Sequence, residues 1–105
     1  MIANTPKPPY YAVIFTSTLG EFKEGYSEMA ELMVKLAQEQ EGFLGIESAR
    51  EDVGITVSYW KDLQSIKKWK ENSEHRIAQE KGQTDWYKCY KTRISKVERD
   101  YEFQN

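Results

Sequence analysis

Segments with strand and helix patterns alternate along this chain, and their order restricts the possible folds more than any other feature. Residues 10–18 are rich in β-branched and aromatic side chains and predict a strand long enough for the centre of a sheet. Residues 43–50 and 54–60 have the same character, and Asp52 and Gly54 supply turn chemistry, so an antiparallel hairpin is expected. Residues 86–101 predict a long last strand, whose alternating lysines and arginines indicate one exposed or partner-facing side.

The segment between the first two strands has the pattern of an amphipathic helix. Its apolar residues recur at steps of four or three, which predicts a helix over residues 23–41. Thr18 and Glu21 have the spacing of an N-terminal capping box, and Gly42 is a natural stop. The residues of this stripe are Phe22, Tyr26, Met29, Met33 and Leu36.

A second helix is expected after the hairpin. Asp62 is a plausible N-cap, and Leu63, Ile66 and Trp69 follow at steps of three on the buried side. The polar residues 71–75 interrupt this pattern, so Ser73 is expected to cap a further short helical turn that ends at 82.

The order strand, helix, strand, strand, helix, strand predicts an α+β fold of the ferredoxin-like βαββαβ type. Its four-stranded antiparallel sheet would carry the helices on one face. We expect residues 1–9, which are polar and proline-rich, to form an extended arm, and residues 10–105 to form a single domain. An uncovered sheet face is a liability for a monomer, so a second copy is expected to pack sheet against sheet, closing a dimeric α+β barrel.

Composition excludes several classes of function. The net charge of -2 argues against a nucleic-acid binder, which normally has a basic surplus. No apolar run approaches the ~20 residues that a membrane span needs. The one cysteine, Cys89, and the lack of a signal-peptide pattern indicate a cytoplasmic protein. Glycine-rich phosphate loops, paired cysteines and zinc-binding spacings are absent from the sequence, so no metal is expected.

Four residues of the predicted second helix are candidates for chemistry. His75 and Gln79 lie one turn apart and can present an imidazole and an amide to a cavity, the first as a base or axial ligand and the second to orient an oxygen. Trp69 can stack on a flat ligand, although its spacing from the apolar residues also fits the core. Asn72 is a candidate for binding or simply a helix breaker.

Aromatic residues at the strand ends form a second candidate group. Arg93 adds a fixed positive charge that can hold a carboxylate or phenolate. A ligand pocket and a subunit interface explain this group equally well. The aromatic residues are Tyr59, Trp60, Trp86, Tyr87 and Tyr90.

Several stretches together resemble the antibiotic biosynthesis monooxygenase domain family, from residue 8 to residue 101. They are "PPYYAVIFTS", "GFLGIESAR", "GITVSYW", "IKKWKENSEH" and "WYKCYKTRISKVERDY". The resemblance implies a dimeric α+β barrel of ferredoxin-like subunits. It also implies one of two activities, because some members oxygenate phenolic polyketides or quinols without metal or flavin, whereas others bind and degrade haem.

The residues of the haem-degrading members transfer only in part. Their site combines an Asn on the first strand with a Trp on the second helix and a His further along. Here Trp69 matches the Trp, but the ligand position falls at Gln79, with His75 one turn earlier, and the first-strand position falls near Phe15 or Thr16. Two of the three positions therefore depart from the pattern of the family.

For oxygenation without a cofactor, the resemblance implies a substrate anion that gives an electron directly to oxygen. In a pocket between the second helix and the sheet, His75 would be the base, Trp69 and Tyr59 the walls, and Arg93 or Gln79 the partner of the anion. Two classes stay open: a small monooxygenase acting on an aromatic or phenolic molecule, and a non-catalytic homodimer that binds a flat aromatic ligand, including haem. A haem-binding or haem-degrading monooxygenase is a further alternative.

Overall fold

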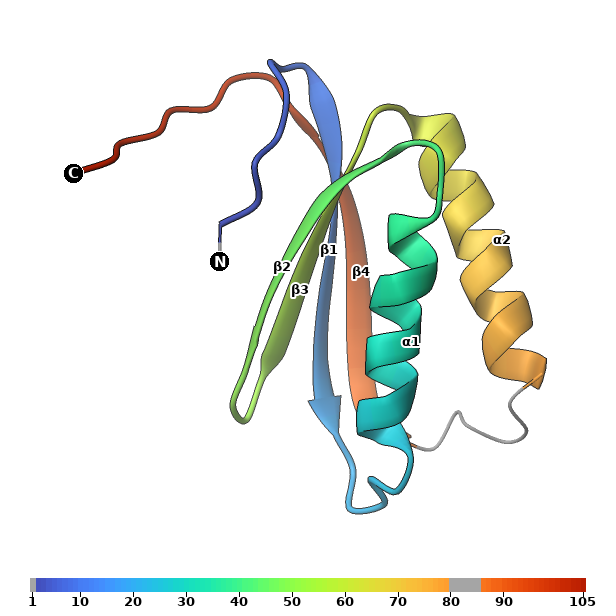
Figure 1. Cartoon of the computed structure of the whole chain (residues 1–105). Helices are drawn as coiled ribbons and strands as arrows, with labels where there is room; N and C mark the ends of the chain where they lie inside the picture. Colours follow the sequence, from blue (N-terminus) through green and yellow to red (C-terminus); the bar gives the residue numbers. More distant parts are fainter. Residues whose placement is uncertain (1, 80–85) are drawn as a thin grey trace.

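The computed structural model describes residues 2–79 and 86–105, which form four strands and two helices (Figure 1). In chain order these are β1 (Tyr10–Leu19), α1 (Tyr26–Gln38), β2 (Phe43–Arg50), β3 (Gly54–Trp60), α2 (Leu63–Gln79) and β4 (Tyr87–Val97). The hairpin strands β2 and β3 have the bounds that the sequence predicts.

The strands form one sheet in the order β2-β3-β1-β4, and all three neighbouring pairs are antiparallel. Figure 1 shows both helices on the same side of this sheet and the two chain ends on the other side. We call these two faces the helix side and the outer face. The predicted fold class, a ferredoxin-like βαββαβ arrangement with helices on one face, is confirmed.

The core lies on the helix side and centres on Trp60, which is 0 % exposed. Ala37 of α1 and Ile66 of α2 are buried against it. The indole N–H of Trp60 donates a hydrogen bond of 2.9 Å to the Ser58 hydroxyl, so burial leaves this donor satisfied. The partly buried residues around this core are Tyr11, Val13, Phe43 and Trp69.

The two faces of β3 carry different side chains. Alternation along the strand places Ser58 and Trp60 on the helix side, so Ile55, Val57 and Tyr59 lie on the outer face. The sequence pattern does not reveal this choice, because the outward set is the more uniformly apolar one. The contribution of β3 to the core is therefore the ring of Trp60 and not a set of aliphatic side chains.

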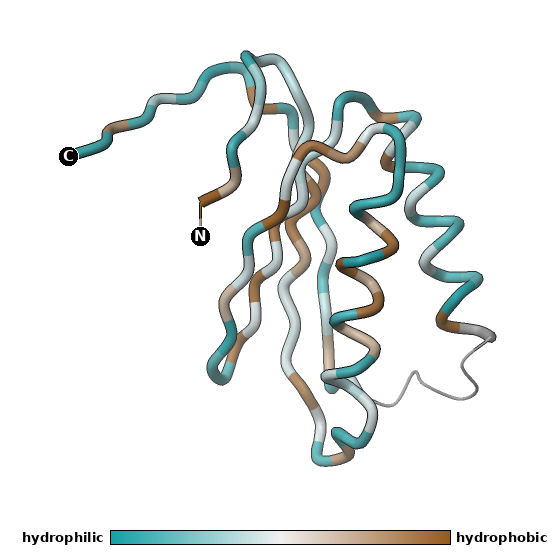
Figure 2. The backbone as a smooth tube through the Cα atoms, viewed as in Figure 1, coloured by the Kyte–Doolittle hydropathy of each residue, from teal (hydrophilic) through white to brown (hydrophobic). Residues whose placement is uncertain are grey.

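Helix α1 is shorter than the sequence predicts, at both ends. It begins at Tyr26 after Gly25, whose φ of 83° is left-handed and therefore suits glycine. Thr18 lies within β1 and pairs with Cys89, so the predicted capping box at Thr18 and Glu21 was wrong. Figure 2 shows hydrophobic residues recurring along α1, in agreement with the predicted stripe.

Helix α2 is continuous, contrary to the predicted interruption at 71–75. Its start is as expected, because the Asp62 carboxylate accepts the backbone N–H of Ser65 at 2.7 Å. Ser73 caps no new turn, and its hydroxyl donates to the Lys70 carbonyl at 3.1 Å within the helix. A serine bonded in this way is compatible with a helix interior. The predicted end at residue 82 lies outside the described residues.

The N-terminal arm is tied to the outer face by hydrogen bonds. The backbone N–H of Ala3 donates to the carboxylate of Glu47 in β2 at 2.8 Å. The hydroxyl of Thr5 donates to the Tyr10 hydroxyl at 2.9 Å, which itself donates to Asp100 at 2.5 Å. Both ends of the chain therefore meet at Tyr10. Among the described helices, none is long and apolar enough to cross a membrane.

Candidate functional site

Five aromatic rings gather on the helix side, where β1 and β4 meet the start of α1. The ring of Phe15 lies 5.4 Å from Tyr87 and 5.3 Å from Tyr90. Tyr26, the first residue of α1, lies 5.8 Å from Tyr87 and 5.9 Å from Trp86. We call these five residues the aromatic cluster.

Trp86 fixes one side of the aromatic cluster to the loop before α1. Its indole N–H donates to the carbonyl of Glu24 at 2.7 Å, and its own carbonyl accepts the backbone N–H of Gly20 at 2.8 Å. Trp86 is buried, and its ring contacts the ring of Tyr26. The cluster is therefore anchored to backbone at this point.

The helix side of β4 continues this aromatic surface and is open. The antiparallel register places Tyr90 beside Ser17, Thr92 beside Phe15 and Ile94 beside Val13. Val13 packs against the core, so these three β4 residues share its face of the sheet. Tyr90 is 63 % exposed and Ile94 is 55 % exposed. We call Tyr90, Thr92 and Ile94 the helix-side strip of β4.

Tyr87 is the most strongly perturbed titratable group of the aromatic cluster. Burial of its ring, followed by the neighbouring Tyr26, raises the pKa of Tyr87 well above the usual range of tyrosine. Its hydroxyl therefore keeps its proton at neutral pH. Its hydroxyl is hydrogen-bonded to Tyr26, and it cannot act as a base.

The structure places His75 and Asn72 away from the sheet. Both line an open hollow of about 460 Å³, together with Gln40, Lys68 and Glu71. Ile66 and Trp69 follow the sheet-facing stripe of α2, whereas positions 68, 72 and 75 follow the opposite stripe at helical spacing. His75 therefore does not line a pocket between α2 and the sheet. The side chain of Gln79 lies outside the described residues.

The two predicted tryptophans belong to the core region. The rings of Trp60 and Trp69 are stacked, with centroids 5.8 Å apart and an interplanar angle of 23°. Trp60 is fully buried, so it is a core residue and not a binding residue. Trp69 is half-buried and packs against the core, which leaves its exposed part as a candidate wall on the helix side of the sheet.

Tyr59 and Arg93 lie on the outer face, on the other side of the sheet from α2. Tyr59 donates a hydrogen bond of 2.7 Å to Glu47, and Arg93 pairs with Ile14, whose side chain points outward. Burial and then Glu47 raise the pKa of Tyr59 to about 12. Neither residue can line a pocket between α2 and the sheet, and this corrects the predicted grouping.

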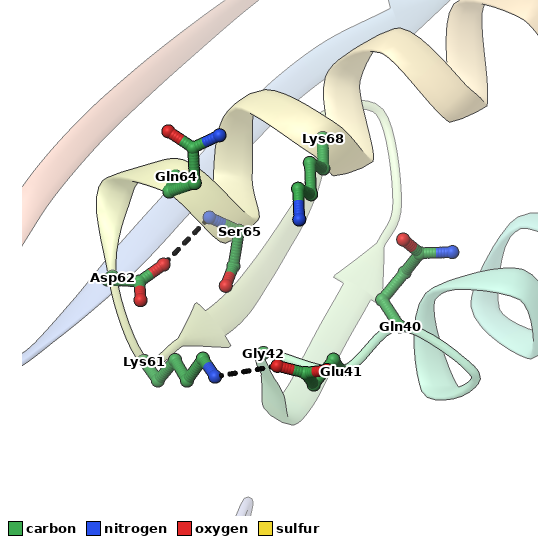
Figure 3. Close-up of a pocket in the computed structure, with 8 residues that line it drawn as sticks. All are labelled: Gln40, Glu41, Gly42, Lys61, Asp62, Gln64, Ser65 and Lys68. Atoms are coloured by element: carbon green, nitrogen blue, oxygen red, sulfur yellow. Dashed lines mark hydrogen bonds and ion pairs between the residues drawn. The ribbon is translucent and has the colours of Figure 1, made fainter.

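A second, smaller hollow of about 170 Å³ lies where β2 and α2 begin (Figure 3). Its lining is polar, and Lys61 forms an ion pair of 3.1 Å with Glu41 across its edge. Figure 3 also shows the hydrogen bond that the backbone N–H of Ser65, in the first turn of α2, donates to the Asp62 carboxylate. The Lys61–Glu41 pair is exposed, so it contributes little to stability.

Trp69 and His75 do not form a pair of side chains around one haem, and the side chain of Gln79, where the ligand position of the family falls, lies outside the described residues. Trp69 faces the sheet, whereas His75 faces away from it, so the two side chains do not enclose one ligand. Nor does any group of three or more His, Cys, Asp or Glu side chains within 2–79 and 86–105 form a candidate metal site.

Sequence reasoning missed two members of the aromatic cluster. The sequence pattern places Tyr26 on the apolar stripe of the first helix, and Phe15 stands at the position of the family's asparagine, so neither pattern predicts their contact with β4. Tyr26 reaches Tyr87 because α1 begins there, directly beside the start of β4. The positive φ of Gly25 sets that start, and glycine in the segment before Tyr26 was the one available signal.

The fold and the open aromatic surface define a small ferredoxin-like domain with a ring-lined helix side. The sequence model of the antibiotic biosynthesis monooxygenase family matches residues 9–81, and the chain belongs to this family. It is 51 % identical over 105 residues to the uncharacterized protein YqjZ of Bacillus subtilis, covering 98 % of this chain and 92 % of that protein.

Two solved structures show the same fold at low sequence identity. The protein PA3566 of Pseudomonas aeruginosa has a TM-score of 0.68 and 16 % identity, over 91 % of this chain and 99 % of that one. SnoaB of Streptomyces nogalater, a cofactor-independent oxygenase, has a TM-score of 0.67 and 8 % identity, over 89 % of this chain and 97 % of that one.

Proposed function

We propose that this protein is a small monooxygenase that oxidises an aromatic, phenolic molecule with dioxygen and without a cofactor. The observation that carries the proposal is the helix-side strip of β4, which is exposed and continues directly into the aromatic cluster. Family membership and the cofactor-independent oxygenase SnoaB support the reaction type. A flat substrate would lie on Phe15 and Tyr90, with Trp69 toward one end.

The reaction needs no external reductant. With 1-naphthol as substrate, one atom of dioxygen becomes the new carbonyl of 1,4-naphthoquinone. The other atom leaves as water with the phenolic hydrogen and one ring hydrogen. The phenolic proton passes to solvent at this open surface, the electron-rich phenolate gives an electron to dioxygen, and the protein contributes orientation.

The chain's own residues supply binding and hydrogen bonding in this scheme. Rings of the aromatic cluster stack on the substrate, and stacked rings contribute beyond the area that they bury. Tyr87 stays protonated and is hydrogen-bonded to Tyr26, whose own hydroxyl would donate to a substrate oxygen. His75 lies on the far side of α2, so the proposal gives it no part in proton transfer.

Oxygen consumption by the purified protein with 1-naphthol and related phenols, in the presence of a chelator, tests the proposal. We expect uptake above the protein-free rate and one labelled oxygen atom in the product from ¹⁸O₂. Tyr90→Ala should slow uptake about tenfold, because it removes an exposed stacking ring worth about 1 kcal/mol or more. Tyr101→Ala, in the exposed C-terminal tail, is the matched control.

Three results would argue against this assignment. No uptake with any phenol, together with saturable binding, would favour a non-catalytic module that binds a flat aromatic ligand. No uptake and no binding would remove both ideas. Loss of oxygen uptake in His75→Ala would mean that the reaction takes place on the side of α2 that faces away from the sheet.

We also propose that two copies pack through their outer faces. Ile14, Ile55 and Val57 lie on this face, and Ile55 is exposed. Packing sheet against sheet would bury these side chains and stabilise a chain of this length.

A further inference from the structure

Arg50 reaches across the helix side of the sheet. It is the last residue of β2 and pairs with Gly54 of β3, yet its guanidinium hydrogen-bonds the hydroxyl of Ser17 in β1. A second N–H group of Arg50 donates to the Ser17 carbonyl at 3.5 Å. This path crosses Gly54, where a Cβ would collide with the guanidinium. Glycine at 54 therefore makes room for the arginine.

One ring of the aromatic cluster, that of Tyr26, lies beside this guanidinium. Its carbon lies 5.7 Å from the ring centroid of Tyr26, which is within the range of a cation–π contact. Tyr90 is in the same cross-strand row, because Ser17 pairs with Gly54 on one side and with Tyr90 on the other. The charge of Arg50 also acts on Tyr87. It lowers the pKa of Tyr87, but burial and Tyr26 raise that pKa by more.

The charge of Arg50 has no described counter-ion. Within residues 2–79 and 86–105, no carboxylate lies at ion-pair distance from its guanidinium. The side chain is half-buried, and its described hydrogen bonds go to Ser17. A guanidinium has five N–H donors, so this arrangement leaves donors available. Removing a cation from water without an anion is unfavourable, and a bound anion would offset that cost.

We propose that Arg50 binds the carboxylate of an aromatic acid whose rings lie on the aromatic cluster. The planar fork of a guanidinium matches a carboxylate through two parallel hydrogen bonds. The Tyr26 ring lies beside this guanidinium, and its hydroxyl, which is hydrogen-bonded to Tyr87, can donate to the bound acid. The inference uses the surface of the proposed function and adds the charge of its ligand.

A purely architectural role is the competing explanation. Arg50 also links the end of the β2–β3 hairpin to β1, and that link alone would explain its contacts with Ser17. The two roles differ in one measurable property. A link acts on stability, whereas a binding group also distinguishes a carboxylate from a neutral group of the same shape.

Binding of 2-naphthoate and of its neutral isostere 2-naphthamide to the full chain makes this distinction without any turnover. In the wild-type protein, naphthoate should bind about tenfold more tightly, as one charge-assisted hydrogen-bonded pair allows. Arg50→Gln should remove this preference while affinity for naphthamide stays within twofold. Arg50→Lys should keep only part of it. Arg93→Gln, the same change on the outer face, should keep all of it.

Backbone amide shifts in the labelled wild-type protein give a readout that does not depend on the folding of a variant. Naphthoate should shift the signals of Arg50, Gly54 and Tyr26 and leave those of Asn72 and His75 in place. The proposal would be overturned if the two probes bound with equal affinity or if neither bound. It would also be overturned if Arg50→Gln kept the preference for naphthoate, or if the amide shifts were confined to α2. Oxygen uptake without carboxylate preference would overturn it and leave the proposed function standing.

Discussion

The hydroxyl of Tyr59 donates a hydrogen bond of 2.7 Å to Glu47, whose second carboxylate oxygen accepts the backbone N–H of Ala3 at 2.8 Å. One carboxylate therefore joins β3, β2 and the N-terminal arm on the outer face. Both donors hold the pKa of Glu47 below its usual value, the Ala3 N–H first and then the Tyr59 hydroxyl. The arm is thus attached through a charge-assisted bond, and breaking that bond has measurable effects.

Tyr59→Phe should lower the free energy of unfolding by about 1–3 kcal/mol at pH 7, because it removes a hydrogen bond to an ionised carboxylate. Chemical denaturation checks this value. Tyr101→Phe, which removes a hydroxyl from the exposed tail, should change stability by less than about 0.5 kcal/mol. An equal effect of both substitutions would mean that the Tyr59–Glu47 bond contributes nothing.

The same substitution should also change how stability depends on pH. The folded pKa of Tyr59 is raised from 10.0 to about 12, so its contribution is complete below pH 10 and is lost as pH rises toward 12. Glu47 has a lowered pKa, so its contribution is present above pH 4.5 and is lost as pH falls through the folded pKa. In Tyr59→Phe, the free energy of unfolding should no longer fall between pH 10 and 12, and its fall in acid should be smaller than in the wild-type protein. Denaturation at a series of pH values measures both changes.

Ile66→Ala should destabilise the protein by about 2–5 kcal/mol, because it leaves a cavity against the indole of Trp60. Ile94→Ala removes the same atoms from the helix-side strip of β4, where the side chain is 55 % exposed. That change should cost no more than about 1 kcal/mol. Thermal melts of the two variants compare them directly, and similar losses would contradict the placement of the core beside α2.

Asp62→Ala should lower the melting temperature by removing the cap of α2, whereas Asp62→Asn should retain most of it. The hydrogen bonds from Ser65 hold the pKa of Asp62 below its usual 3.8. Its contribution is therefore present above pH 3.8 and is lost as pH falls through the folded pKa. Melts at pH 7 and at low pH should show the gap between the wild-type protein and Asp62→Ala narrowing in acid, because protonated Asp62, like asparagine, still accepts the Ser65 N–H but has lost its charge. A constant gap would assign the effect to packing.

Val57→Arg should convert the proposed dimer to a monomer, because it places a charge in the centre of the outer face. Light scattering on a sizing column should give twice the chain mass of 12.4 kDa for the wild-type protein and the chain mass for the variant. Thr92→Arg, on the helix side, is the control and should stay dimeric. A monomeric wild-type protein would exclude the outer face as a subunit interface.

The sequence predicted the order of elements well because each segment has its own periodicity. The hairpin strands are bounded by glycine and polar turn residues, so even their ends were correct. Helix ends were less predictable. Gly25 starts α1 through its backbone conformation, which no spacing of side chains reveals, and Ser73 is accommodated inside α2 by a bond to Lys70.

The candidate site was harder to predict because it depends on which residues face which side. A strand pattern gives alternation but not direction, so Tyr59 and Arg93 were grouped with α2 although they lie across the sheet from it. Arg50 was missed because its contact with Ser17 spans an intervening strand. Arg50 reaches Ser17 only because the strand register aligns the two residues across β3 and because Gly54 has no side chain between them.

The anchored arm makes the two ends of the chain unequal as points of attachment. An affinity tag or surface linker fused before residue 1 would pull on a segment whose Ala3 amide is bonded to Glu47. The last five residues, in contrast, are exposed, so a fusion there would extend into solvent. Immobilisation for binding assays is therefore best made through the C-terminus, where the tether leaves the helix side of the sheet accessible.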